Sequence, residues 1–360
     1  MAKARLMNRP ADYEKLGINP DRIETWEDGI RITPDRMNWE WWYFDAILEG
    51  GTKVVIQFFS KSGASMYLKN YHPKFIFQVN RPDGKEYRVE PSFSRDEASW
   101  SRERCDVRYV EHYFSGDFRD YQIHLEPIQG LGADLTLHSL STPYRPGSSY
   151  FAFGDDSRNY TWLCAVPRGE VTGTLTIDGK TEAVRGAGYH DHQWGNVNFL
   201  KEWNHWVWAR QNFEDCSMIV FDMVSNEKTE FTRFPLAFVQ DLDGRLLFEN
   251  TEDVQCHVPE TYTDSASGKV YPKEIRYVFE NGGKHAEYTL KTGEIIECNG
   301  RKNLSAAKRL ITRAAGIDPA YTRYAGTGRM FLSENNRALE RSGKLIFEFM
   351  YPGKTFEGHM

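Results

Sequence analysis

Residues 183–196 read AVRGAGYHDHQWGN, a stretch that joins a strand-like alternation to three glycines. The side chains of an extended chain alternate between two faces. One face then carries His190, His192 and Trp194, and the other carries Tyr189, Asp191 and Gln193. Glycines in such a run are typical of a tight bend or of two backbones that approach closely. The stretch therefore predicts a strand whose two faces differ in chemistry.

Strand patterns also dominate the sequence on either side. Short runs rich in Val, Ile, Phe, Tyr and Thr recur about every ten residues, with alternation at 52–60, 74–79, 134–140 and 172–178. Turn dipeptides separate them, such as Asp178-Gly179 and Asn281-Gly282. Many antiparallel strands favour closed or nearly closed barrels, which leave few exposed edges. We predict an all-β fold of two tandem β-barrel domains, 1–199 and 200–360.

One segment has a helical period. Leu304, Ala307, Leu310, Ile311 and Ala314 are spaced by three and four residues, with Lys308, Arg309 and Arg313 between them. This pattern predicts one late helix over Ser305–Ala315, packed on a barrel.

Composition excludes several classes of protein. Among 360 residues, 45 Lys and Arg face 51 Asp and Glu, so the net charge of −6 gives no basic field for nucleic acid. No apolar stretch approaches the roughly 20 residues of a membrane-spanning helix. The N-terminus lacks the apolar core of a secretory signal, and the five cysteines are scattered and odd in number. We expect a cytoplasmic protein with reduced cysteines and no stable membrane insertion.

A second aromatic run begins at Glu40 and reads EWWYFD. As a strand it sends Glu40, Trp42 and Phe44 to one face and Trp41, Tyr43 and Asp45 to the other. A carboxyl group held against an indole loses solvation, so its pKa rises and it becomes a candidate general acid. The structural alternative is that large rings close a barrel while Glu40 anchors a turn or pairs with an arginine.

Two histidines at i and i+2, His190 and His192, have the spacing with which a strand offers two imidazoles to one metal. A metal site needs further ligands, and the sequence after Gly195 supplies no carboxylate before Glu202. We therefore predict no metal and expect hydrogen bonds to hold both histidines.

A third cluster follows at residues 203–224. Trp206, Trp208 and Arg210 share one face of a predicted strand, and Asp222 lies in a strand whose two faces are both apolar. A buried carboxylate must be paired, hydrogen-bonded or protonated. The structural alternative is an ion pair of Asp222 with Arg210 or with a histidine.

The runs from Glu40 to Asp45 and from Gly186 to Gly195, with the stretch VPRGEVTG at 166–173, resemble the lipocalin-like family that contains the carotenoid 1,2-hydratases and AttH-type proteins. Decalin-forming Diels-Alderases are similar to it. The resemblance covers most of the chain and implies two calycin-like barrels, a hydrophobic pocket, and no metal or organic cofactor. It implies catalytic roles for His192, Trp194 and Asp222, although Val220 stands where a tyrosine would be expected.

These observations lead to one principal hypothesis. The chain is expected to be a cofactor-independent enzyme that hydrates or cyclises a polyene, terpenoid or polyketide-like molecule in an aromatic pocket between its domains. The expected catalytic groups are Asp222, His192, Asp191 and Glu40. Asp222 in its neutral form is the expected proton donor, and His192, held by Asp191 or Asp222, is expected to pass the proton or to activate water. The expected substrate-binding side chains are Trp42, Tyr43, Tyr189, His190, Trp194, Trp206, Trp208 and Arg210. The alternatives are a pericyclase that works by orientation and a lipocalin-like carrier without activity. The sequence does not indicate an oligomeric state.

Overall fold

The structure is a computed structural model that describes residues 3–265, 267–299, 319–335 and 337–353. The chain divides into two units. The first contains Leu6–Ala152 and Asp156–Asn198, and the second contains Met1–Arg5, Phe153–Asp155 and Phe199–Met360. The predicted boundary at 199/200 between two domains stays a prediction.

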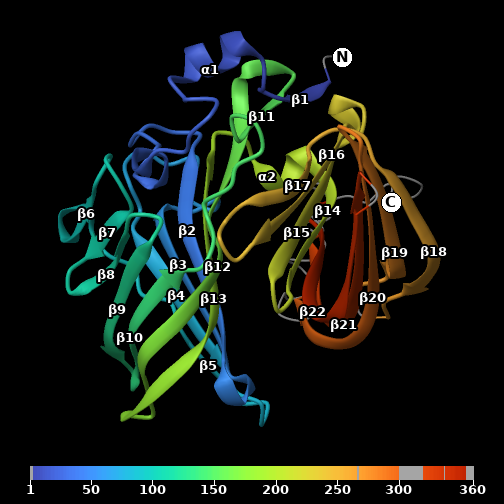
Figure 1. The fold of residues 1–360 in the computed structure, drawn as a ribbon. Helices are drawn as coiled ribbons and strands as arrows, with labels where there is room; N and C mark the ends of the chain where they lie inside the picture. Colours follow the sequence, from blue (N-terminus) through green and yellow to red (C-terminus); the bar gives the residue numbers. More distant parts are fainter. Residues whose placement is uncertain (1–2, 266, 300–318, 336, 354–360) are drawn as a thin grey trace. The chain divides into compact units, whose positions relative to one another are not determined.

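Each unit is built on one large antiparallel sheet, which curls as a half-barrel (Figure 1). The all-β, lipocalin-like fold predicted from the strand patterns is thereby confirmed. Among the described residues the helices are short, namely α1 (Pro10–Leu16), α2 (Phe199–Glu202) and the 3-10 turns η1 (Thr25–Asp28), η2 (Glu49–Gly51), η3 (Arg95–Glu97) and η4 (Glu227–Thr229). The predicted late helix, Ser305–Ala315, lies outside the described residues.

The first sheet runs in the order β5-β4-β3-β2-β13-β12-β10-β9-β8-β7-β6, with β1 and β11 attached through β12. Its strands are β1 (Ala4–Leu6), β2 (Trp39–Leu48), β3 (Lys53–Lys61), β4 (Lys74–Asn80), β5 (Glu86–Val89), β6 (Ala98–Trp100), β7 (Asp106–Tyr109), β8 (His112–Gly116), β9 (Asp120–Ile128), β10 (Leu131–Ser139), β11 (Tyr150–Phe153), β12 (Asp155–Ile177) and β13 (Lys180–Gly195).

The second sheet runs in the order β17-β16-β15-β14-β22-β21-β20-β19-β18. Its strands are β14 (Trp203–Asn212), β15 (Cys216–Ser225), β16 (Arg233–Asp241), β17 (Leu246–Asn250), β18 (Gln255–Thr263), β19 (Val270–Asn281), β20 (Lys284–Asn299), β21 (Ala320–Glu334) and β22 (Arg337–Tyr351).

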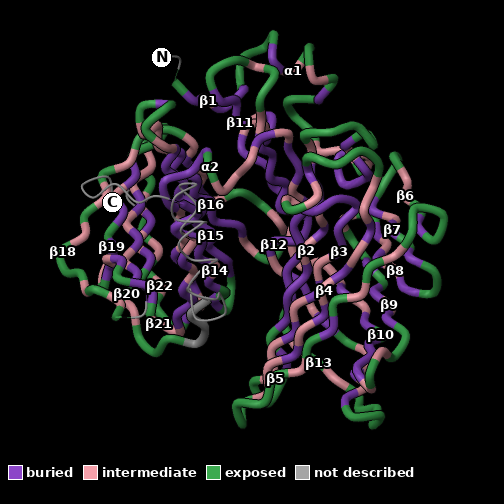
Figure 2. Tube along the Cα trace, turned by 180° about the vertical axis from the view of Figure 1, so that it is seen from behind, coloured by how far each residue is buried: buried purple, intermediate pink, exposed green. Residues whose placement is uncertain are grey.

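Apolar side chains alternate along the strands, and those on the concave side of each sheet form its buried core. In the first unit, Trp42, Phe44, Phe58 and Phe114 belong to one buried cluster. In the second unit, Val207, Val220, Tyr277 and Phe347 belong to another. Buried segments therefore follow the strands, while turns are exposed (Figure 2).

The glycines of the central motif have a packing reason. A Cβ atom on Gly186 would lie 2.3 Å from the carbonyl oxygen of Ile47, and one on Gly188 would lie 2.5 Å from Cγ2 of Val171. Both distances are too short for real contacts, so β13 packs against β2 and β12 only because these side chains are absent. Asp178 and Gly179 both have positive φ at the β12–β13 hairpin, as the predicted turn requires.

Candidate functional site

The two aromatic motifs lie side by side, because β13 pairs with β2 in antiparallel register. His192 is opposite Trp42, and Trp194 is opposite Glu40. The predicted division of faces holds on both strands. His190, His192, Trp194, Glu40 and Trp42 lie on the inner face, which packs against the core cluster of the first unit, whereas Tyr43, Tyr189 and Asp191 lie on the outer face. The register therefore creates two separate chemical environments on one pair of strands.

On the inner face, Glu40 accepts three hydrogen bonds. Its Oε1 receives the backbone N–H of Arg31 at 2.6 Å and lies 3.2 Å from Nε2 of His192, and its Oε2 receives the Ser60 hydroxyl at 2.7 Å. These three donors fix the orientation of the Glu40 carboxyl group. We therefore assign a hydrogen on Nε2 of His192 to its bond with Glu40.

A second pair involves Asp28, which belongs to neither of the two aromatic motifs. Nδ1 of His190 lies 2.8 Å from the carbonyl oxygen of Tyr43, and Nε2 lies 3.1 Å from Oδ2 of Asp28. The Tyr121 hydroxyl donates to the same Oδ2 at 2.7 Å. Asp28 ends the 3-10 turn η1, and Glu27 beside it forms a buried ion pair with Arg145 at 2.8 Å. The only sequence signal was an acidic pair between Trp26 and Gly29.

The His192–Glu40 pair and the His190–Asp28 pair approach each other at two atoms that lack hydrogen bonds. Nδ1 of His192 and Oδ1 of Asp28 are 3.5 Å apart, and neither has a hydrogen-bond partner among the described residues. The Trp42 ring stacks on His192 with centroids 4.5 Å apart, and the Trp194 ring lies 4.6 Å away on a tilt. The inner face thus holds two carboxyl groups and two imidazoles among aromatic rings, and all four residues are buried.

Asp28, Cys105 and His190 also bring three potential metal ligands within 4.8 Å of one another. Nε2 of His190 already lies within hydrogen-bond distance of Oδ2 of Asp28, and the Cys105 thiol donates to the carbonyl oxygen of Phe114. Burial raises the pKa of the Cys105 thiol well above its usual value, which disfavours the thiolate that a metal needs. We assign no metal here, and the absence of a cofactor stays a prediction.

The outer face is centred on Asp191. Its carboxylate accepts hydrogen bonds from the Tyr189 hydroxyl at 2.9 Å, the Trp162 indole at 3.2 Å and the Gln193 amide at 3.1 Å. Burial raises the pKa of Asp191 to about 6, and these donors together with the charge of His190 oppose the rise. Tyr43 on the same face is half-buried. Asp191 is therefore a carboxyl group that changes its protonation close to neutral pH.

This arrangement corrects one expectation from the sequence. His192 was expected to be held by Asp191 or Asp222, but its ring contacts Glu40 and Asp28. Asp191 follows the alternation of the strand and points to the opposite face, so its side chain cannot orient His192.

Asp222 lies on β15 in the second unit, facing the core. Arg233 binds it with two hydrogen bonds, of 2.8 Å from Nε and 2.5 Å from Nη2, and the Tyr277 hydroxyl donates at 3.0 Å. Burial lowers the pKa of Arg233. The charge of Asp222 and its hydrogen bonds together raise that pKa by more, so the net change is upward. The expected pairing with Arg210 or a histidine is wrong. A two-pronged ion pair also does not suit a neutral proton donor.

Trp206, Trp208 and Arg210 share a face of β14, as expected, with the Arg210 guanidinium 5.7 Å from the Trp208 ring centre. The neighbouring Val207 and Ala209 belong to the core of the second unit. The three side chains therefore lie on the face opposite to Asp222, and the structure does not place them around its carboxylate.

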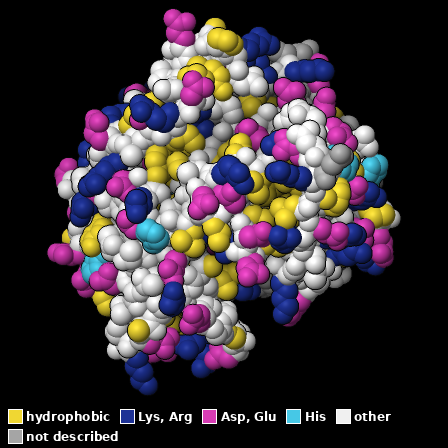
Figure 3. All heavy atoms as spheres, viewed as in Figure 1, with side chains coloured by type: hydrophobic (Ala, Val, Ile, Leu, Met, Phe, Trp, Pro, Cys, Tyr) yellow, Lys and Arg dark blue, Asp and Glu magenta, His cyan; other side chains and the backbone are white. Residues whose placement is uncertain are grey.

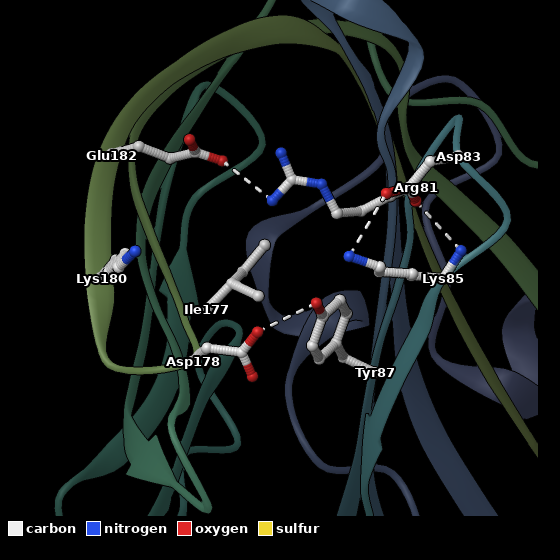
Figure 4. Close-up of a pocket in the computed structure, with 8 residues that line it drawn as sticks. All are labelled: Arg81, Asp83, Lys85, Tyr87, Ile177, Asp178, Lys180 and Glu182. Carbon is white, nitrogen blue, oxygen red and sulfur yellow. Dashed lines mark hydrogen bonds and ion pairs between the residues drawn. The ribbon is translucent and has the colours of Figure 1, made fainter.

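A surface pocket of about 330 Å³ lies at the hairpin end of the first sheet and contains none of the predicted site residues (Figure 4). It is lined by Arg81, Asp83, Lys85, Tyr87, Ile177, Asp178, Lys180 and Glu182. Arg81 lies 3.8 Å from Glu182, Lys85 lies 3.7 Å from Asp83, and Tyr87 donates to Asp178 at 3.0 Å. Because these groups already neutralise one another, we assign no ligand to the pocket.

Two further expectations concern partners. In the part of the chain that the structure describes, no helix has the length and apolar character needed to span a bilayer. Lys and Arg side chains are interspersed with Asp and Glu on the face shown in Figure 3. The absence of a nucleic-acid partner stays a prediction.

Comparison with known proteins agrees with this architecture. The profile of the AttH-like family matches residues 33–292, which include both aromatic motifs. The chain belongs to the AttH-like family. It is 26% identical to the hydroxyneurosporene dehydrogenase of Chlorobaculum tepidum, over 88% of this chain and 83% of that protein.

Two solved structures share the fold. CghA in complex with Sch210972 has a TM-score of 0.61 at 14% identity, covering 94% of this chain and 97% of the other. Kievitone hydratase from Nectria haematococca has a TM-score of 0.51 at 13% identity, covering 87% and 88%. At these identities the likeness shows the architecture alone.

Proposed function

We propose that this member of the AttH-like family is an enzyme that transforms a hydrophobic small molecule, of the polyene, terpenoid or polyketide class, with Asp191 as the proton donor. The similar proteins support a small organic substrate, since their names describe a hydroxyneurosporene dehydrogenase and a kievitone hydratase. These names differ in reaction, so they support the substrate class more than any one chemistry.

The observation that carries the proposal is the Asp191 cluster. A general acid works best when its pKa lies near the working pH. Asp191 meets this condition at about 6, and it does so beside Tyr189, Trp162 and the half-buried Tyr43. Of these rings, that of the half-buried Tyr43 offers a face on which an apolar substrate can lie and a developing cation can be stabilised.

The reaction follows from the proton balance. Protonated Asp191 gives its hydrogen to an alkene carbon or a carbonyl oxygen of the substrate, and positive charge develops on a neighbouring carbon. In hydration, water adds to that carbon and the Asp191 carboxylate takes up the proton released. In cyclisation, a second double bond adds instead and the carboxylate removes a proton from an adjacent carbon. Neither route changes the overall oxidation state of the substrate, so neither calls for a redox cofactor.

The inner face provides the alternative position for proton transfer. His192 Nδ1 faces Asp28 without a hydrogen-bond partner among the described residues, while Glu40 holds the other ring nitrogen. This is the arrangement in which a carboxylate orients an imidazole base. The four side chains are buried, so a substrate reaches them only by entering the barrel.

Product analysis tests the proposal directly. Purified wild-type protein, Asp191→Asn and Glu40→Gln are incubated with a panel of polyenes and prenylated phenols, and products are identified by mass spectrometry. We expect wild type to form an isomer or a water adduct, Asp191→Asn to form none, and Glu40→Gln to retain turnover. Substrate returned unchanged by wild type would favour a carrier. Turnover that is independent of pH and of Asp191 would favour an orienting pericyclase.

A further inference from the structure

Two loops at one end of the first sheet expose large apolar side chains. Met37 precedes β2 and is 41% exposed, while Tyr67 and Leu68 follow β3 and are 54% and 52% exposed. We call these three side chains the tip patch. Exposed apolar groups that gather in one place mark contact surfaces more often than single ones do.

The loops that carry the tip patch are fastened to each other. The Met37 N–H donates to the carbonyl oxygen of Met66 at 2.6 Å, and the Asn70 N–H donates to that of Pro34 at 2.7 Å. The buried ammonium of Lys61 donates to the carbonyl oxygens of Asp35 and Leu68, each at 2.6 Å. The apolar side chains are therefore presented on a fixed scaffold.

Basic residues flank the tip patch on both loops. Arg36 precedes Met37 and Lys69 follows Leu68, and both are exposed. The nearby Asp35 carboxylate accepts a hydrogen bond from the Thr33 hydroxyl at 3.0 Å. The tip thus carries an excess of positive charge in a chain whose net charge is −6. Apolar side chains flanked by Arg36 and Lys69 match a lipid surface with anionic headgroups.

The tip patch lies at the strand end nearest the Asp191 cluster. Trp39 at the start of β2 pairs with Gly195 at the end of β13, and Tyr43 pairs with Asp191. Four residues of strand separate these two pairs, or roughly 13 Å. The Asn198 amide, just after β13, donates to the Tyr67 hydroxyl at 3.0 Å.

We propose that the tip patch docks this protein onto an anionic lipid surface, with Met37, Tyr67 and Leu68 entering the headgroup region and Arg36 and Lys69 contacting lipid phosphates. An apolar substrate dissolved in that surface would then be taken up beside the proton donor. The docking surface goes beyond the proposed function and stands independently of proton transfer by Asp191.

Vesicle flotation tests the docking surface. Full-length protein is mixed with vesicles of phosphatidylcholine alone or with added phosphatidylglycerol, at low and high salt. We expect wild type to float with the anionic vesicles and to be released by salt. Met37→Glu/Leu68→Glu should weaken binding by roughly tenfold or more, and Arg36→Glu/Lys69→Glu should remove the preference for anionic lipid.

The matched control is Val110→Glu, since Val110 is 59% exposed in the turn between β7 and β8 of the same unit. It should bind as wild type does, and so should Asp191→Asn, which separates docking from catalysis. All variants are first checked for an unchanged circular dichroism spectrum. The proposal would be overturned if wild type did not float with the vesicles, or if Val110→Glu lost as much vesicle binding as Met37→Glu/Leu68→Glu. A wild-type dimer that Met37→Glu/Leu68→Glu converts to monomer without any lipid binding would also overturn it, because the patch would then join two copies.

Discussion

The two faces of β13 place ionisable groups in opposite situations. On the inner face, His190 and His192 each lie beside a carboxylate, and Glu40 accepts further hydrogen bonds from Arg31 and Ser60. On the outer face, Asp191 is just as buried but has only neutral donors as hydrogen-bond partners. Adjacent residues of one strand thus have different electrostatic surroundings.

The difference shows which buried carboxyl group is suited to exchange protons. A carboxylate paired with an imidazole and several donors gains stability in its charged form, so it serves mainly to hold structure. A carboxyl group that is desolvated and has only neutral hydrogen-bond donors keeps its proton to higher pH, as Asp191 does. Burial alone therefore does not identify a catalytic acid, whereas burial without a paired charge does favour one.

The largest expected effect is on turnover when the outer carboxyl group is removed. Asp191→Asn keeps the shape of the side chain but cannot give up a proton, so kcat should fall by roughly 10²-fold or more. Asp178→Asn is the control, since Asp178 lies in the exposed β12–β13 hairpin, where asparagine suits its positive φ. Steady-state kinetics at pH 6 and below, where Asp191 is protonated, provides the measurement. Full activity of Asp191→Asn would refute its role as the acid.

On the inner face, the expected effect is on stability. Glu40→Gln leaves the donors from Arg31, Ser60 and His192 with one acceptor oxygen, so unfolding should become easier by about 3 kcal/mol. The kcat of the folded protein should change by less than roughly tenfold, because this face is assigned a structural role. Chemical denaturation and kinetics on the same sample distinguish the two effects. A large fall in kcat with unchanged stability would instead move proton transfer to His192.

The third prediction concerns the pH dependence of stability. The pKa of Asp191 is about 6 in the folded state and 3.8 in the unfolded chain, so the folded state binds the proton more tightly between these values. Its contribution is complete below about pH 4 and is lost as the pH rises through about 6, by up to roughly 3 kcal/mol. The stability of wild type relative to Asp191→Asn should decline over that range in denaturation experiments. A constant difference would contradict the raised pKa.

The smallest expected effect is a shift in the pH profile. The Tyr189 hydroxyl donates to the Asp191 carboxylate and so favours its charged form. Tyr189→Phe removes that donor, and the midpoint at which activity falls with rising pH should move up by about one pH unit. Comparison of pH–rate profiles for the two proteins gives the shift. A downward shift would mean that the donor acts on some other group.

The sequence predicted the strands well, but it predicted the partners of the buried charged side chains poorly. Alternation at residues 189–194 correctly separated the two histidines from Asp191, because side-chain direction in a strand depends only on position. It could not identify Asp28, which reaches His190 across 162 residues of chain. The sequence likewise did not identify the partner of Asp222, which is Arg233 on β16 and not Arg210. Asp222 was recognised as buried, but its partner depends on the neighbouring strand and its register.

The sequence by itself determined the fold class and the contents of each strand face, since hydrophobic period and turn glycines act over a few residues. Only the tertiary structure decided which charges became paired. Pairing depends on contacts between segments far apart in the chain, set by strand register and by the packing of the turn that carries Asp28. The same residue type, an aspartate buried in a strand, therefore became the partner of an arginine at position 222 and a carboxyl group held by neutral donors at position 191.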